Sequence, residues 1–383
     1  MDFELQWLLW ALPLAFALGW VASRWDRRQW QRELQGSQKV YYKGLNLLLN
    51  EQHDKAIDAF IEAVQQDPDT SDLHFALGNL FRRRGEFERA VRVHEHLLHR
   101  ADLPRTERDR AQHALAQDFM KAGLFDRAES AYRALDGSTF DTEARLALLT
   151  LHERSRDWRA AVEVAQKLEH RGTGSFASRI AHYWCEIALE ADAKHRGDEA
   201  ADAIDKAREA APQAVRPLVI AGQRAARRGD PAEVLSLWGV LMVAHPAAFN
   251  LVAIDYARSA LAAGDAGGAA ARLRELHARA PTMDLLEALA LLDPNPARQR
   301  ERALQQLRSH PTLSLAKALI TQHDTASFGP AETLALGDAV GRAAQPLHRY
   351  RCAACGFEAQ HYFWQCPGCS SWDSYPPQRL EDL

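Results

Sequence analysis

Cysteine is scarce in this sequence, and the residue patterns of common catalytic sites are absent. Five cysteines in 383 residues do not form the disulfide framework of a small secreted domain. The sequence has no Walker-type glycine loop, no nucleophile elbow and no paired-carboxylate pattern. The formal net charge of −4 is near balance, so the charge of the whole chain indicates neither nucleic acid nor an anionic surface as a partner. Together, these absences favour an ordered protein that is not an enzyme.

Three short patterns could be mistaken for chemical sites. His94, Glu95 and His96 have the composition of a zinc-protease signature, but that signature needs two residues between its glutamate and its second histidine. His94 stands where the second helix of a helical pair needs a packing aromatic residue, which predicts a structural role. Residues 172–174 lack the third glycine of a dinucleotide loop and indicate a connector. Cys185 is alone on a helical segment, which favours a packed thiol over a nucleophile.

The chain does contain a repeated pair of amphipathic helices. Gly44 and Gly78 are 34 residues apart, and so are Ala56 and Ala90. Apolar residues recur at helical spacing on both helices of each copy, and a small residue stands where the two helices cross. A single pair cannot bury such a stripe, so each pair must pack against a neighbour of the same kind. The stripes include Leu47, Ala56, Ile57, Phe60, Ala63 and Val64 in the first copy and Leu77, Leu80, Phe81, Ala90, Val91 and Leu97 in the second.

These copies resemble tetratricopeptide repeats. Gly44, Phe60 and Pro68 match the small, aromatic and proline positions of that motif, whereas Val40 replaces its usual fourth-position aromatic. The alternative is accidental periodicity in a helical protein rich in alanine and arginine. The resemblance implies a mainly α fold, with a tetratricopeptide-repeat α-solenoid over residues 39–311 and closing helices over 312–346. Later copies are marked by Leu115, Phe119, Gly123, Ala128, Tyr132, Ala161, Pro212, Pro246 and Pro281.

The resemblance also implies a partner-binding groove, built from the first helix of each pair. Its excess of arginine predicts a partner segment with carboxylate groups, although solvated surface charge is the alternative. Tyr41 and Leu45 stand where relatives that bind chaperone termini have the first of their groove residues, which argues against that partner. The residues expected to face the groove are Tyr41, Phe75, Asn79, Arg82, Arg83, Arg110, His113, Lys121, Arg154, Arg216, Gln223 and Arg227.

The N-terminal residues 1–23 have the composition of a membrane anchor. Residues 5–23 are almost entirely apolar and, as a helix, would cover roughly 28 Å, close to the hydrocarbon thickness of a bilayer. Arg24, Arg27 and Arg28 follow directly, so the positive-inside rule places the N-terminus outside and the bulk of the chain in the cytoplasm. A cleaved signal peptide would carry its positive charge before the apolar run, and a buried helix is the other alternative. A polar helix over the next residues, 24–38, is expected to join the anchor to the first repeat.

The C-terminal residues 347–383 carry the most specific chemistry. Two cysteine pairs, each with two residues between its members, place sulfurs on two tight turns that together can complete a tetrahedral four-thiolate metal site. Gly356 and Gly368 supply the permissive residues that such turns need. A segment this short has too small a core to fold alone, so the ion would contribute much of its folding energy. The predicted ligands are Cys352, Cys355, Cys366 and Cys369.

The pattern resembles a rubredoxin-like or zinc-ribbon domain with one bound ion, iron or zinc. Two redox-active dithiols are the alternative, but a catalytic pair would be single and would begin a helix of a larger domain. Rubredoxins usually have glycine after the second pair, where this chain has Ser370. That difference favours a structural or docking role over electron transfer.

The order of these parts, over essentially the whole length, resembles the lipopolysaccharide assembly protein B family of Gram-negative inner membranes. The resemblance implies an adaptor without enzymatic activity that limits lipopolysaccharide synthesis by helping the membrane protease FtsH degrade the LpxC deacetylase. It also implies opposition by an inner-membrane regulator of the PbgA/YejM type. Two alternatives stay open: a membrane-bound electron-transfer protein with a four-cysteine iron site, and an assembly factor for a secretion or respiratory complex.

Overall fold

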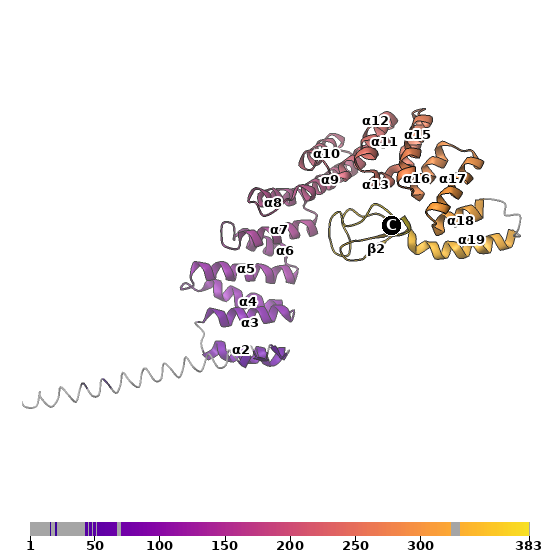
Figure 1. Ribbon diagram of the computed structural model, residues 1–383. Helices are drawn as coiled ribbons and strands as arrows, with labels where there is room; N and C mark the ends of the chain where they lie inside the picture. Colours follow the sequence, from indigo (N-terminus) through magenta and orange to yellow (C-terminus); the bar gives the residue numbers. More distant parts are fainter. Residues whose placement is uncertain are drawn as a thin grey trace, which may run out of the picture. The chain divides into compact units, whose positions relative to one another are not determined.

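The computed structural model describes residues 16, 20, 43, 44, 46, 47, 49, 50, 52–66, 70–322 and 330–382 (Figure 1). The chain divides into two units, Met1–Ala160 (unit 1) and Ala161–Leu383 (unit 2), and each is described by itself. Within the described ranges, no helix is both long and apolar enough to cross a membrane. Apart from Phe16 and Trp20, the predicted anchor lies outside the described residues, and so do residues 24–38, Arg24, Arg27, Arg28 and Tyr41.

Unit 1 consists of helices joined by short turns, and each helix packs against the next one in the chain. α3 also contacts α5, so the first helix of one pair meets the first helix of the following pair. This is the stacking predicted for tetratricopeptide repeats. The helices are α2 (His53–Gln66), α3 (Ser71–Arg83), α4 (Phe87–His99), α5 (Arg105–Ala122), α6 (Phe125–Arg133) and α7 (Asp141–Ser155).

Glycines allow the two helices of a pair to approach closely. A Cβ atom added at Gly78 would lie 2.5 Å from Nε2 of His94, and one added at Gly222 would lie 2.1 Å from Nε1 of Trp238. Both distances are too short for a real contact, so only glycine leaves room for the ring of the second helix. The prediction that His94 fills the place of a packing aromatic is therefore confirmed.

Unit 2 continues the helical pairs and has its own apolar core, in which Trp238, Phe249 and Tyr256 are almost fully buried. α8 (Trp158–His170) crosses the boundary between the two units. The further helices are α9 (Ala177–Ala193), α10 (Gly197–Ala210), α11 (Val215–Arg228), α12 (Pro231–Ala244), α13 (Pro246–Phe249), η1 (Asn250–Val252), α14 (Ala253–Ala262), α15 (Ala266–Arg279), α16 (Met283–Leu292), α17 (Pro296–Ser309), α18 (Leu313–Gln322) and α19 (Pro330–Ala344).

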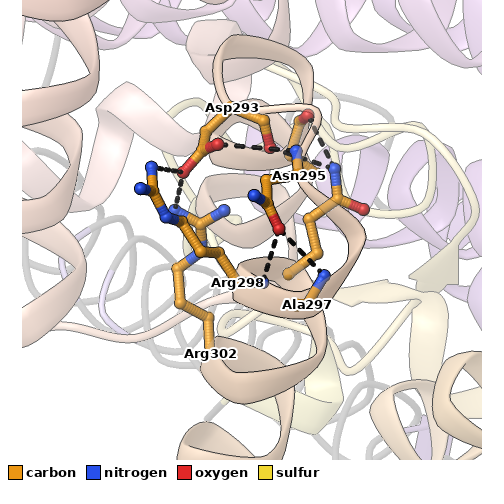
Figure 2. A network of polar contacts seen from close by, with 7 residues as sticks. Asp293, Asn295, Ala297, Arg298 and Arg302 are labelled. Carbon is orange, nitrogen blue, oxygen red and sulfur yellow. Dashed lines mark hydrogen bonds and ion pairs between the residues drawn. The ribbon is translucent and has the colours of Figure 1, made fainter.

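Polar contacts fix the turn between α16 and α17 (Figure 2). The Asn295 side chain accepts hydrogen bonds from the backbone N–H groups of Ala297 at 3.1 Å and Arg298 at 3.2 Å. These bonds satisfy two of the N–H groups that the start of a helix leaves without partners. Arg302, one turn further along, reaches back to Asp293 at 3.1 Å. α17 therefore begins at a defined point, and α18 and α19 pack beyond it.

The C-terminal segment forms a small domain with little regular structure. After η2 (Gln345–His348), strands β1 (Tyr350–Arg351) and β2 (Glu358–Ala359) pair antiparallel, with Tyr350 opposite Ala359. A short 3₁₀ helix, η3 (Leu380–Asp382), follows near the end of the chain. The apolar core of this domain is small and consists of Tyr350, Cys352, Cys366 and Tyr375.

Candidate metal centre

Four cysteine sulfurs meet in the C-terminal domain. The Sγ atoms of Cys352, Cys355, Cys366 and Cys369 all lie within 4.8 Å of one another. Two separations across the site are 3.8 Å, for Cys352 and Cys369, and 3.7 Å, for Cys355 and Cys366. Four sulfurs placed tetrahedrally at 2.3 Å from a zinc ion would be about 3.8 Å apart. The cage therefore has the size that one four-coordinate ion requires, and the domain could bind one metal ion.

Each cysteine pair lies on a turn with the same hydrogen bonds. In the first turn, the N–H of Gly356 donates to the carbonyl of Cys352 at 2.9 Å, and in the second, the N–H of Ser370 donates to that of Cys366 at 2.8 Å. Gly356 has a φ of 77° and Ser370 a φ of 58°. Both residues have a left-handed backbone conformation, so the chain reverses direction directly after the second cysteine of each pair.

The structure corrects the role expected for Gly368. Among the described residues, Gly368 is not one of the glycines with positive φ, and Ser370 takes the left-handed position of the second turn. A Cβ atom added at Gly368 would instead lie 3.2 Å from Cδ2 of Phe357. Gly368 therefore lies close to the Phe357 ring of the first turn, and a larger residue there would push this ring aside by a few tenths of an ångström.

Nearby hydroxyl and amide groups favour the thiolate form of two cysteines. Ser374 Oγ lies 3.3 Å from Cys352 Sγ, and Ser371 Oγ lies 3.3 Å from Cys369 Sγ. The Ser374 hydroxyl and backbone N–H groups lower the pKa of the Cys352 thiol to about 6. The Ser371 hydroxyl and its backbone N–H lower the pKa of Cys369 as well. Despite the backbone N–H of Phe357, burial and the neighbouring cysteines raise the pKa of Cys355 to about 12. Cys352 and Cys369 are therefore the two ligands that the surroundings hold toward the thiolate, the metal-binding form of cysteine.

Asp373 attaches the metal domain to α9 through polar contacts. Its carboxylate lies 2.7 Å from His182 Nε2 and accepts a hydrogen bond from the Ser178 hydroxyl at 2.9 Å. Although burial opposes ionisation, these hydrogen bonds and the charge of Arg216 hold the pKa of the Asp373 carboxyl below its usual range. The His182 ring also stacks on Trp372, with 4.6 Å between ring centroids.

Arg216, on α11, is covered by the same domain. Its guanidinium lies 5.7 Å from the Trp364 ring centroid and 5.8 Å from that of Trp372, and it pairs with Glu186 at 2.6 Å. Only 5% of the residue is exposed. Arg216 is therefore closed to an external partner, because the chain's own metal domain occupies this part of the helical surface.

Comparison with known proteins assigns the chain to a family. Residues 350–376 match the family described as rubredoxin metal binding domain, and residues 73–110 and 113–176 match tetratricopeptide repeat families. Lipopolysaccharide assembly protein B of Escherichia coli strain K12 is 33% identical over 388 aligned residues, which cover 98% of each chain. This chain belongs to the lipopolysaccharide assembly protein B family. The Haemophilus influenzae protein of the same name is 27% identical and also covers 98% of each chain.

The solved structures that resemble this family member have lower sequence identity to it. A tetratricopeptide repeat protein from Parabacteroides merdae is 15% identical with a TM-score of 0.34, and the match covers 67% of this chain and 99% of that one. A complex titled Naa15/Naa10 bound to HypK-THB contains a chain that is 16% identical with a TM-score of 0.41. That match covers 75% of this chain and 46% of the other.

The C-terminal tail of this family member fastens the metal domain to later helices. The Arg379 guanidinium lies 3.4 Å from the Asp284 carboxylate on α16. Glu381, on η3, accepts a hydrogen bond from the Ser314 hydroxyl of α18 at 2.7 Å. These residues, like His182 and Asp373, could not be predicted from the sequence, because single charged or polar residues far apart in the chain form no motif.

In unit 1, the predicted groove residues divide into buried, paired and exposed ones. Phe75 is only 2% exposed and lies in the core under the Arg110 guanidinium, so its expected place on the groove surface is wrong. Arg110 pairs with Asp72 at 2.8 Å, and Arg82 pairs with the buried Asp118 at 2.8 Å. His113 stacks on Phe140, and Asn79 accepts a hydrogen bond from Arg82. The exposed members are Arg83, Lys121 and Arg154.

Two further residues have structural roles. Cys185 is fully buried, and burial raises the pKa of its thiol to about 12, so it is a packed thiol as predicted. His94 is also fully buried, and its Nδ1 lies 2.5 Å from the carboxylate of Asp118. Asp118 therefore joins His94 of α4 to Arg82 of α3, and these contacts hold the second repeat against the third.

Proposed function

We propose that this chain is a membrane-anchored cytoplasmic adaptor that limits lipopolysaccharide synthesis by delivering the LpxC deacetylase to the membrane protease FtsH. The main support is the similarity to lipopolysaccharide assembly protein B, which covers 98% of both chains and therefore includes every part of the architecture. Tetratricopeptide repeats are protein-binding modules, and this supports an adaptor over an enzyme. The identities of the protease and of its client are inferred from the resemblance of the whole sequence to this family.

The proposed mechanism is proximity at the inner membrane. An N-terminal span over residues 5–23, with a periplasmic N-terminus and Arg24, Arg27 and Arg28 on the cytoplasmic side, confines the repeats to the membrane surface. A client held there meets a membrane protease at an effective concentration that reaches the millimolar range for short tethers. A regulator of the PbgA/YejM type would act on the same span and so reduce delivery.

Unit 1 offers the surface that we propose for the client. Arg83, Lys121 and Arg154 are exposed in the last turns of α3, α5 and α7, the first helices of three successive pairs. None of the three has an ion pair among the described residues. A client segment with several carboxylates would complement this series of cations. In unit 2, the metal domain covers Arg216, so the equivalent surface there is occupied.

We propose that the ion is zinc and that it holds the metal domain in the shape that docks on α9 and α11. Iron with an electron-transfer role is the second candidate, and one observation favours it: Cys355 and Cys369 are exposed, which would bring one side of the cage close to solvent. The purified protein separates the two. Colourless protein with one equivalent of zinc supports the structural role, whereas a visible iron–thiolate band that bleaches on reduction supports electron transfer.

Deletion of residues 1–23 tests the adaptor proposal. At native expression, the truncated chain is expected to fold and load metal but to let LpxC accumulate, because the client no longer meets the protease at the membrane. LpxC is measured by immunoblot after protein synthesis is stopped. A chain with an unrelated transmembrane helix in place of residues 1–23 is the control for tethering alone. Normal LpxC turnover with the truncated chain would show that proximity is not the mechanism.

A further inference from the structure

A polar pocket of about 660 Å³ lies at the end of unit 2, between α18, α19 and the metal domain. Lys317 of α18, Arg342 of α19 and Arg379 of the C-terminal tail bring three cationic side chains to it. His348 and His361 add two imidazoles. We call this cavity the closing pocket, because it forms where the last helices of the array meet the metal domain.

The contacts around the closing pocket give it a defined shape. Ser314 Oγ lies 2.5 Å from His348 Nε2, and Arg379 donates to the carbonyl of His348 at 3.3 Å. The N–H of Leu380 donates to the carbonyl of Arg349 at 2.9 Å, which holds the tail beside the start of the metal domain. The walls therefore come from separate elements that are hydrogen-bonded to one another, as in a preformed ligand site.

The lining of the pocket carries an excess of positive charge, with three cationic side chains and one carboxylate. Asp338 is the one carboxylate among its described lining residues. Asp284, at 3.4 Å, and Glu287 offset part of the Arg379 charge, and Glu381 lies 3.5 Å from His348. Arg342 is exposed and has no ion pair among the residues that the structure describes. Its guanidinium can therefore bind an anion without first breaking another contact.

We propose that the closing pocket binds a small phosphate ester that carries hydroxyl groups. Arginine and lysine side chains that converge from different elements suit a phosphate, which arginine can bind through two parallel hydrogen bonds. The amide side chains of Gln345 and Gln360 and the Asp338 carboxylate suit hydroxyl groups. The volume lies within the usual range for small-molecule sites and leaves room for more than inorganic phosphate. This site is independent of the proposed delivery of LpxC.

Calorimetry on the full-length chain in phosphatidylcholine nanodiscs tests the proposal, with glucose 1-phosphate as the probe and glucose as its neutral control. The chain is expected to bind glucose 1-phosphate and not glucose. Arg342→Gln should weaken binding about tenfold, the effect of losing one charge-assisted hydrogen bond. Arg274→Gln removes an exposed cation from α15, away from the pocket, and should leave the affinity unchanged.

Gly341→Leu tests the pocket without changing its charge. Gly341 lines the pocket, and a Cβ atom there would lie 3.1 Å from Nζ of Lys317, the far end of a flexible side chain, so a leucine would extend into the cavity. Since leucine also favours a helix more than glycine does, the variant should melt no lower than the natural protein. It is expected to abolish binding of glucose 1-phosphate while the helical circular dichroism is retained.

Nanodiscs that contain phosphatidylglycerol distinguish the two sources of such a ligand. If a lipid headgroup occupies the pocket, these nanodiscs should weaken binding of glucose 1-phosphate relative to pure phosphatidylcholine, and if the ligand is a free metabolite, the affinity should not change. The proposal is overturned if glucose 1-phosphate fails to bind in pure phosphatidylcholine. It is also overturned if Arg342→Gln and Arg274→Gln weaken binding equally.

Discussion

Backbone conformation at single residues determines how the four cysteines meet. Gly356 and Ser370 both occupy the left-handed region, with φ values of 77° and 58°, and each directly follows the second cysteine of its pair. A side chain at such a position costs roughly 1–2 kcal/mol, which glycine avoids. Ser370 therefore strains the second turn, while its N–H still forms the hydrogen bond to Cys366 that closes the turn.

Opposite substitutions at these two positions should change metal affinity in opposite directions. Ser370→Gly is expected to stabilise the second turn by about 1 kcal/mol and Gly356→Ala to destabilise the first by at least as much. Because metal binding is coupled to folding of the domain, the dissociation constant for zinc should fall about fivefold in the first variant and rise in the second. Competition with a coloured chelator measures both constants. A shift of both variants in the same direction would contradict this account.

At the scale of helices, most of the fold could be predicted because each repeat obeys local rules. The glycine at each helix crossing and the apolar stripe determine which faces are buried, and residues such as Phe60, Ala90 and Leu97 are buried as expected. The prediction failed at Phe75, which lies on the first helix α3 but faces Leu97 of α4 and Ala111 of α5. The sequence of one repeat does not show how far the next repeat covers it.

At the same scale, the exposed cations at the ends of the first helices are predicted to bind the client. Changing Arg83, Lys121 and Arg154 together to glutamate should reduce capture of LpxC by at least about tenfold, because an acidic client would then meet three like charges. Some loss of helix stability is also expected, since cations favour helix C-termini by about 0.3–1 kcal/mol each. Photo-crosslinking in intact membranes measures the capture.

A matched control separates client binding from helix stability. Arg133 lies in the last turn of α6, a second helix, so Arg133→Glu reverses a charge at a helix end that does not belong to the proposed surface. It also breaks the ion pair of Arg133 with Glu129 at 2.5 Å. It should lower the melting temperature without affecting capture. If the loss of capture in Arg133→Glu and in the triple variant is proportional to the decrease in melting temperature, the charges act through stability alone.

Across the whole chain, the least predictable feature is the docking of the metal domain on the helices of unit 2. Ser178 and His182 meet Asp373 from positions nearly two hundred residues earlier, and no periodicity connects them. The four metal-binding candidates, by contrast, were visible in the sequence, because their spacing is local and their chemistry is rare. Spacing therefore predicts the cage, and only the folded chain shows which helices it contacts.

Removal of the metal should release this docking without unfolding the array. Cys352→Ser, or a strong chelator acting on the natural protein, is expected to expose residues 347–383 to protease, because the small core of the domain includes Cys352 and Cys366 themselves. The helices of unit 2 should keep their circular dichroism, since Trp238 and Phe249 are buried in a core that needs no metal. Cys185→Ala removes a thiol outside the cage and should leave the C-terminal domain protected. A protease-resistant C-terminal domain in metal-free protein would mean that contacts such as those of Asp373 and Arg379 fold it unaided, and the ion would then serve another purpose.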